Sequence, residues 1–172
     1  MSDRPEIPGG LNPLRCAYVE TSAVSYATAE GRAADVVLSR RASTRAWLRS
    51  TAFTPVVSDD VVSECRDGDA AEAAKRLLVM ADWPVLPPHP TVDEVADDLL
   101  RSRLVPETQP LDARHIAFAA CYRTAVLASL NFKHIVNTRL VGRIEARLRD
   151  DWGLPLKIAT PEAIMLLETS DE

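Results

Sequence analysis

Long apolar runs are missing from this chain of 172 residues. No stretch approaches the roughly 20 apolar residues that a membrane-spanning helix needs, so we expect no membrane anchor. The opening residues, Met1 to Pro5, have no apolar stretch behind them, and we also expect no signal peptide. Internal repeats, linkers and low-complexity tracts are missing too, and a single domain is the simplest organisation for a chain of this length.

Cysteine is scarce. The three residues Cys16, Cys65 and Cys121 are far apart in the sequence, and no CxxC pair occurs. An odd number of scattered cysteines is typical of buried thiols in a reducing compartment, and not of a disulfide framework. We therefore expect a cytoplasmic protein whose cysteines stay free.

Aromatic residues are few, and the chain has no surplus of positive charge. Aromatics make up 5% of the chain, and 25 acidic residues against 20 Lys and Arg leave a formal net charge of −5. Few aromatics combined with abundant alanine favour helices that pack through small and aliphatic side chains. The acidic balance argues against a large RNA-binding surface, because nucleic-acid binders usually carry a basic face. An enzyme that holds phosphates through metal ions remains compatible with it.

Short apolar runs alternate with amphipathic segments along the chain. The runs predict strands at residues 15–20, 54–57, 84–86, 125–128 and 157–159. Helices are predicted after residues 21–22, at 33–50, 59–66, 69–82, 91–104, 111–124 and 138–151, and from 160 onward. This alternation predicts an α/β fold with three layers, α/β/α, around a central, mainly parallel sheet of four to five short strands. The breaker-rich residues 1–14 predict a flexible leader, so residues 15–172 would form the domain.

Acidic and amide residues follow the predicted strands. Glu20 ends the first strand, Glu64 lies about one and a half turns into the helix after the second, and Asp112 begins the helix before the fourth. Asn131 follows the fourth strand. Because parallel strands all end at one edge of a sheet, these four residues could meet there. The alternative is that they are helix caps, as is common at strand ends, and Glu64 could be a surface residue.

A divalent cation would stabilise such a cluster, since neighbouring carboxylates repel each other and raise each other's pKa. Hard oxygen ligands with few histidines favour Mg²⁺ or Mn²⁺ over Zn²⁺. Thr21 and Ser22, which follow Glu20, are better interpreted as helix caps than as catalytic residues, and Ser58 is a further predicted cap.

Five short motifs resemble those of PIN domains, in the branch that has Glu where most members have Asp. They are Tyr18–Tyr26 for the opening strand and turn, Ser63–Leu77 for the second acidic helix, Leu111–Ala117 for D-A-x-H-I-A, Leu130–Ile135 for W-N-F-x-H-I, and Thr160–Glu162 for the closing T-P-E. The motifs occur in the family's order and cover the chain from about Cys16 to Met165.

This family is similar to the VapC-type toxins of bacterial type II toxin–antitoxin pairs, which are ribonucleases that an antitoxin inhibits. The resemblance implies a metal-dependent endoribonuclease that uses Mg²⁺ or Mn²⁺, with RNA as substrate and with an antitoxin protein and a second copy of the chain as candidate partners. It implies that Glu20, Glu64 and Asp112 hold the ion. Asn131 would position water or a second ion, which makes these four the candidate catalytic residues.

The sequence departs from the family's pattern at three places. Glu20 is one methylene longer than the usual Asp, and Leu130 replaces the usual Trp. Asn131 stands where many active members have Asp, so the site would carry three negative charges in place of four. The rival interpretation is a catalytically silent PIN domain that binds RNA or a protein partner, which Asn131 and the acidic composition favour.

Histidines and arginines offer further candidates. His115, one turn after Asp112, could share a metal with it, but a hydrogen bond within the fold is the interpretation we favour. The sequence suggests no partner for His89 or His134. A stripe formed by Arg139, Arg143 and Arg147 could hold RNA phosphates, although a solvated helix face is the commoner meaning of such a pattern.

Overall fold

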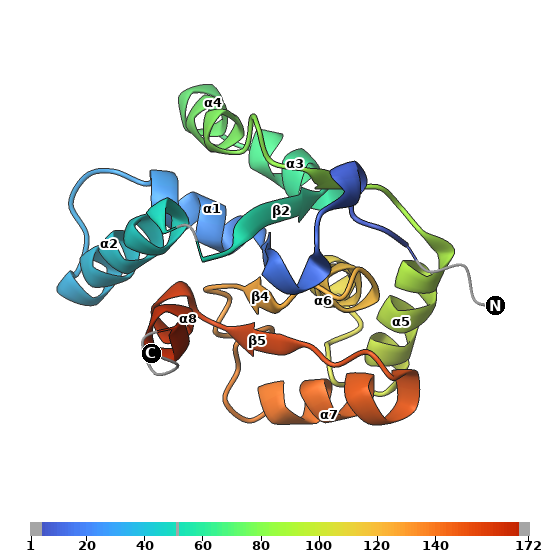
Figure 1. Cartoon of the computed structure of the whole chain (residues 1–172). Coiled ribbons are helices and arrows are strands. Elements are labelled where there is room, and N and C mark those ends of the chain that lie inside the picture. Colours follow the sequence, from blue (N-terminus) through green and yellow to red (C-terminus); the bar gives the residue numbers. More distant parts are fainter. Residues whose placement is uncertain (1–4, 51, 169–172) are drawn as a thin grey trace.

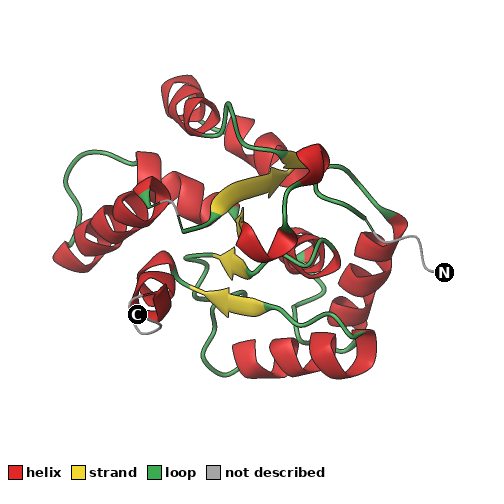
Figure 2. Cartoon of the chain, viewed as in Figure 1, coloured by secondary structure: helices red, strands yellow, loops and turns green. Residues whose placement is uncertain are grey.

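Five parallel strands form the centre of the protein. The computed structural model describes residues 5–50 and 52–168. The strands are β1 Cys16–Val19, β2 Thr54–Ser58, β3 Val85–Leu86, β4 Val126–Ala128 and β5 Lys157–Ala159. They pair in the order β3-β2-β1-β4-β5, and every pair is parallel. The predicted fold class is confirmed, since helices flank this sheet in a three-layer α/β/α arrangement (Figure 2).

The helices form two groups, one on each face of the sheet. They are α1 Thr21–Thr28, α2 Asp35–Arg49, α3 Asp59–Arg66, α4 Ala70–Val79, α5 Pro90–Arg101, α6 Pro110–Cys121, α7 Val141–Trp152 and α8 Pro161–Glu168. Helix α1 packs on α2, α3 and α4, and α2 packs on α8, whereas α5 packs on α6 (Figure 1). The chain moves across the sheet from β1 to β3 and then returns to β4 and β5 in the opposite direction. Because each crossover is right-handed, this change of direction puts the connecting helices on opposite faces. Among the described residues, no helix has the length and apolar character needed to cross a membrane.

Strand β1 occupies the middle of the sheet, and all four of its residues are buried. Tyr18 lies beside Val56 of β2 on one side and beside Leu127 of β4 on the other. Parallel strands that are buried on both faces appear in a sequence as continuous apolar runs, without alternation. For this reason the five predicted strands agree with the structure to within one or two residues at their ends.

The predicted leader lies partly outside the described residues. Within it, the structure has two 3₁₀ turns, Pro8–Gly10 and Pro13–Arg15, and Ile7 is buried in the hydrophobic core. The carbonyl oxygen of Pro13 accepts a hydrogen bond of 3.2 Å from the amide of Ala125, just before β4. This segment therefore contacts the edge of the sheet where the strands begin.

The three cysteines are free and buried, as the sequence predicted. Burial raises the pKa of the Cys65 thiol to about 11 and that of Cys121 to about 12. Burial also raises the pKa of Cys16. At neutral pH all three side chains are therefore protonated and behave as small apolar groups in the core.

Replacing Leu127 by Ala should test the position of the core. Leu127 is fully buried on β4, so Leu127→Ala should lower the free energy of unfolding by about 2–5 kcal/mol, as deletion of a buried Leu side chain usually does. Leu78 on α4 is 77% exposed and provides the control, for which we expect a change within about 0.5 kcal/mol. Urea denaturation measures both, and equal losses would contradict the central position of β4.

Candidate active site

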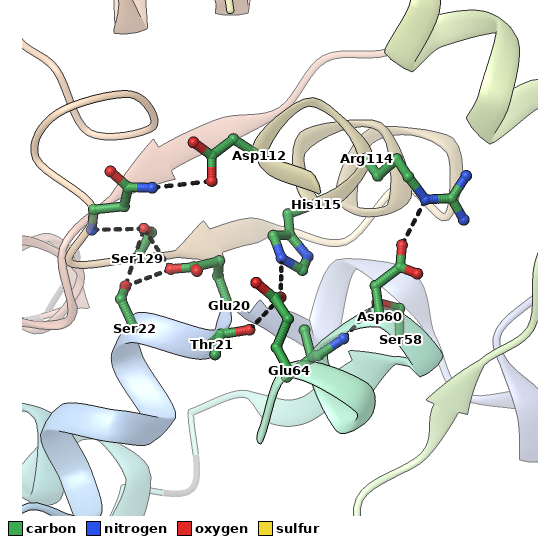
Figure 3. Close-up of polar contacts among 12 residues, drawn as sticks. Glu20, Thr21, Ser22, Ser58, Asp60, Glu64, Asp112, Arg114, His115 and Ser129 are labelled. Carbon is green, nitrogen blue, oxygen red and sulfur yellow. Dashed lines mark hydrogen bonds and ion pairs between the residues drawn. The ribbon is translucent and has the colours of Figure 1, made fainter. Parts of the chain in front are cut away.

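The edge at which the strands end brings the four predicted residues near one another. Glu20 directly follows β1, Asn131 follows β4, Asp112 lies in the first turn of α6, and Glu64 lies on α3. Figure 3 shows Glu20 between Asp112 and Glu64. The sheet order reverses between β1 and β4, which is the position where open α/β sheets usually bind ligands.

Glu20 is a buried carboxylate, with 4% of its surface exposed. The hydroxyl of Ser129 donates a hydrogen bond of 2.8 Å to Glu20 Oε2, and the hydroxyl of Ser22 donates to the same oxygen. Although Glu20 stands at the N-cap position of α1, its side chain does not cap the helix. Within the described residues no Lys, Arg or His forms an ion pair with it.

Thr21 and Ser22 are not helix caps, and the prediction that they cap α1 was wrong. Glu20 takes the cap position, so both residues fall in the first turn of α1. Their hydroxyls face the acidic groups instead: Thr21 Oγ1 donates to Glu64 Oε2 at 2.7 Å, and Ser22 donates to Glu20. Two neighbours in the sequence thereby hold carboxylates that come from different elements.

Glu64 belongs to a chain of hydrogen bonds that runs through His115. His115 Nε2 lies 2.7 Å from Glu64 Oε2, and Nδ1 lies 2.8 Å from the hydroxyl of Tyr18. That hydroxyl is 2.7 Å from Ser58 Oγ, which also caps α3, as predicted. The preferred interpretation of His115, a hydrogen bond within the fold, is confirmed. Glu64 is held among α1, α3 and α6 and is not a freely solvated surface residue.

The pKa values of Glu64 and His115 move in opposite directions. Burial raises the pKa of Glu64, but the hydrogen bond and charge of His115, with the Thr21 hydroxyl, bring it below its ordinary value. Burial lowers the pKa of His115, yet the hydrogen bond that it donates to Glu64 and the charges of Glu20, Glu64 and Asp60 raise it above its ordinary value. These directions favour an imidazolium paired with a carboxylate.

Asp112 is held by the turn that follows β4. Asn131 Nδ2 donates to Asp112 Oδ1 at 3.1 Å, and His134 Nδ1 lies 2.8 Å from Asp112 Oδ2. Asn131 Oδ1 accepts a hydrogen bond of 3.1 Å from the backbone amide of His134. Asn131 therefore stabilises its own turn, as a cap would, and also contacts the acidic cluster.

The contact of His134 with Asp112 was not predicted from the sequence, which suggested no partner for His134. The available signal was its position three residues after Asn131 in a short turn, which places both side chains toward Asp112. His89 also has a partner: its side chain accepts a hydrogen bond from the amide of Thr91 and caps α5.

Arg114 and Arg147 both form ion pairs with acidic residues outside the cluster. Arg114, next to His115, forms ion pairs with Asp60 at 2.7 Å and with Asp93. Arg147 of the predicted stripe forms a two-bonded ion pair with Asp98, at 2.7 and 2.9 Å. These pairs are consistent with a solvated, salt-bridged face for the stripe.

The side chains of the cluster are of the types that bind Mg²⁺, but they are not positioned as one set of ion ligands. Within residues 5–50 and 52–168, no group of three or more His, Cys, Asp or Glu side chains is placed so that it could hold a metal ion. In addition, protein donors already occupy both oxygens of Asp112 and one oxygen each of Glu20 and Glu64. The carboxylate and amide oxygens are nevertheless the ligands that Mg²⁺ and Mn²⁺ prefer. An ion would therefore have to replace some of these hydrogen bonds.

Comparison of the chain with models of known protein families, with curated proteins and with solved structures finds no significant match. The resemblance to PIN domains rests on the short motifs alone, and the function has to be inferred from the site.

The Glu64–His115 pair should stabilise the fold most at mildly acidic pH. His115, with its raised pKa, contributes stability that is fully present below its unfolded pKa and is lost as pH rises through the folded value. Glu64, with its lowered pKa, contributes stability that is present above its unfolded pKa and is lost as pH falls through the folded value. A double-mutant cycle of Glu64→Gln and His115→Gln should therefore give a coupling of about 0.5–3 kcal/mol near pH 5.5 and a smaller one near pH 8.5.

The exposed pair of Glu72 and Lys75, 2.9 Å apart, provides the control for this cycle. Its coupling should stay below about 1 kcal/mol and change little over the same pH range. Urea denaturation at both pH values measures the two couplings. A coupling between Glu64 and His115 that does not depend on pH would mean that they form a neutral hydrogen bond.

Proposed function

We propose that this protein is a metal-dependent endoribonuclease that takes Mg²⁺ or Mn²⁺ at Glu20, Glu64 and Asp112, with Asn131 beside them. The observation that carries the proposal is that three carboxylates, from three separate segments, lie along the edge where the sheet order reverses, although they would have to move closer together to bind one ion. The PIN-like motifs place the same residues in the same roles and support RNA as the substrate. They also support a toxin-like effector of a type II pair, acting in the cytoplasm, with an antitoxin protein and a second copy of the chain as partners.

The burial of Glu20 is the physical argument for a cation. A buried carboxylate is costly unless donors or a positive charge compensate it, and Glu20 receives only hydroxyl hydrogen bonds among the described residues. Nearby Asp112 adds further negative charge, which a divalent ion would offset, whereas the His115 imidazolium already offsets the charge of Glu64. When bound, such an ion supplies Lewis-acid activation of a phosphodiester and of water.

The surrounding side chains would orient the ligands. Ser22 and Ser129 hold Glu20, and His115 holds Glu64. Asp112 is oriented by His134 and Asn131 in the same way. Partners of this kind fix the direction of a carboxylate, and their loss usually weakens metal sites by one to two orders of magnitude.

A silent domain that binds RNA or a protein partner is the second candidate function. The observation that favours it is the saturation of Asp112, whose two oxygens accept hydrogen bonds from Asn131 and His134. A carboxylate held in this way is stable without an ion. The amide of Asn131 also adds no charge that would attract one.

Manganese should separate these two functions. An ion that binds only the folded protein stabilises it by about 2.7 kcal/mol at a hundred times its dissociation constant, which raises the melting temperature. Wild-type protein should show this rise and should cut generic RNA with Mn²⁺ but not with EDTA. Asp112→Asn should abolish both effects and still fold, because the amide keeps the size of the carboxylate.

Asp82→Asn, which removes an exposed carboxylate just after α4, is the matched control and should behave as wild type. An equal temperature rise in wild type and Asp112→Asn would assign the stabilisation to surface ions. A rise that depends on Asp112 but comes without any cleavage would favour the silent domain.

Replacing Asn131 by Asp tests the fourth position of the site. The substitution removes the donor to Asp112 Oδ1 and places two carboxylates side by side, so the metal-free protein should lose stability at neutral pH. With Mn²⁺ the added charge becomes favourable: at roughly 4 Å and an effective dielectric near 20 the attraction between the divalent ion and one carboxylate is on the order of 8 kcal/mol before desolvation and repulsion are subtracted. A remainder of about 1.4 kcal/mol suffices for tenfold tighter binding. Calorimetric titration of Mn²⁺ into both proteins measures this, and unchanged affinity would place residue 131 outside the ion's ligands.

A further inference from the structure

A small pocket lies beside the acidic cluster, between α2, the turn after β4 and the start of α8. Its volume is about 90 Å³, and its walls include Arg40 and Ser43 of α2, Leu130 and Phe132 of the turn, and Glu162 of α8. Sites for whole small molecules are usually about 300–1,000 Å³, so this pocket fits only part of a larger ligand.

Arg40 and Phe132 form the most distinctive feature of this pocket. The guanidinium carbon of Arg40 lies 4.1 Å from the centre of the Phe132 ring, and Phe132 as a residue is 40% exposed. Exposed phenylalanine is unusual in this chain, since the other two, Phe53 and Phe118, are partly or fully buried. The pair therefore presents a flat aromatic surface and a positive charge to the solvent.

Arg40 differs from the other arginines near it on α2. Arg41 donates to the carbonyl oxygen of Gly31 in the loop before α2 at 3.0 Å, and Arg45 donates to that of Ala27 in the last turn of α1 at 2.7 Å. The side chain of Arg40 forms no hydrogen bond or ion pair in the part of the chain that the structure describes. Its one recorded contact in that part of the chain is the stacking on Phe132.

The turn after β4 contributes residues both to the pocket wall and to the acidic cluster. The amide of Leu130, in the pocket wall, donates a hydrogen bond of 2.8 Å to Ser22 Oγ, and Ser22 donates to Glu20. Asn131, the next residue, contacts Asp112, and Phe132 follows it directly. The pocket wall and the acidic cluster are therefore joined by one short turn and one chain of hydrogen bonds.

We propose that this pocket is a nucleotide subsite that takes one unpaired base of single-stranded RNA, next to the phosphate at the acidic cluster. Unstacked bases bind by stacking on aromatic rings and guanidinium planes, and Arg40 can also pair with the adjoining phosphate. Glu162 at the pocket makes it unsuited to a phosphate alone and leaves an acceptor for the amino groups of a base. This inference rests on the proposed ribonuclease function and names how that site would hold its substrate.

Binding and cleavage by matched variants test the subsite. Binding of fluorescein-labelled oligoadenylate RNA is measured by anisotropy in EDTA, and cleavage of the same RNA is measured with Mn²⁺. Phe132→Leu and Arg40→Gln should each weaken binding by at least about fivefold, the lower end of what loss of one stacked base costs. KM should rise by a similar factor while kcat changes little.

Two controls separate stacking from general effects of charge and packing. Phe132→Tyr keeps the ring and should bind as wild type. Arg49→Gln removes the same charge from the exposed last turn of α2 and should also bind as wild type. Binding of a duplex of the same length should not depend on Phe132.

The outcomes distinguish this inference from the function on which it rests. If wild type cuts the RNA but Phe132→Leu and Arg40→Gln bind and cut as it does, the subsite is wrong and the nuclease stands. If Arg40→Gln and Arg49→Gln weaken binding equally, the effect is one of net charge and the subsite is wrong. If wild type neither binds nor cuts the RNA, the proposed function fails and the subsite fails with it.

Discussion

Parallel pairing of β1 on both of its sides is the constraint on which the rest of the molecule depends. Because β1 is flanked by β2 and β4, the residue that follows it leaves the sheet in the interior and not at the border. That residue is Glu20, whose buried carboxylate needs donors. Ser22 and Ser129 provide them, and Ser129 brings the turn after β4 into the same place. The pairing of one short strand thus determines which segments surround the acidic cluster.

The same hydrogen bonds both orient the carboxylates and occupy them. His115 and His134 direct Glu64 and Asp112 toward the edge of the sheet, yet each takes an oxygen that a cation would use. In an enzyme the binding of the ion compensates for the loss of such hydrogen bonds. In a domain that binds no ion, the hydrogen bonds stay formed. The balance between ion and hydrogen bond therefore decides between the two candidate functions.

The sequence predicted the sheet well because strands buried on both faces appear as short continuous apolar runs. It also predicted that Glu20, Glu64, Asp112 and Asn131 gather at one edge, since this follows from parallel topology alone. The roles of Thr21 and Ser22 could not be predicted, because a hydroxyl after a strand suits a cap equally well. The partner of His134 and the contact between Arg40 and Phe132 depend on segments that meet only after folding. For His134 the spacing of three residues from Asn131 was a local signal, whereas no local pattern links Arg40 on α2 to Phe132 after β4.

The three buried thiols can report on local unfolding of the protein. Cys16 begins β1, Cys65 lies on α3, and Cys121 ends α6, so they mark the sheet and the helices on either side of it. With their raised pKa values they stay unreactive while the layers remain packed. An alkylating reagent would therefore modify each one only when its layer separates. The order in which they react would show which part of the molecule loosens first.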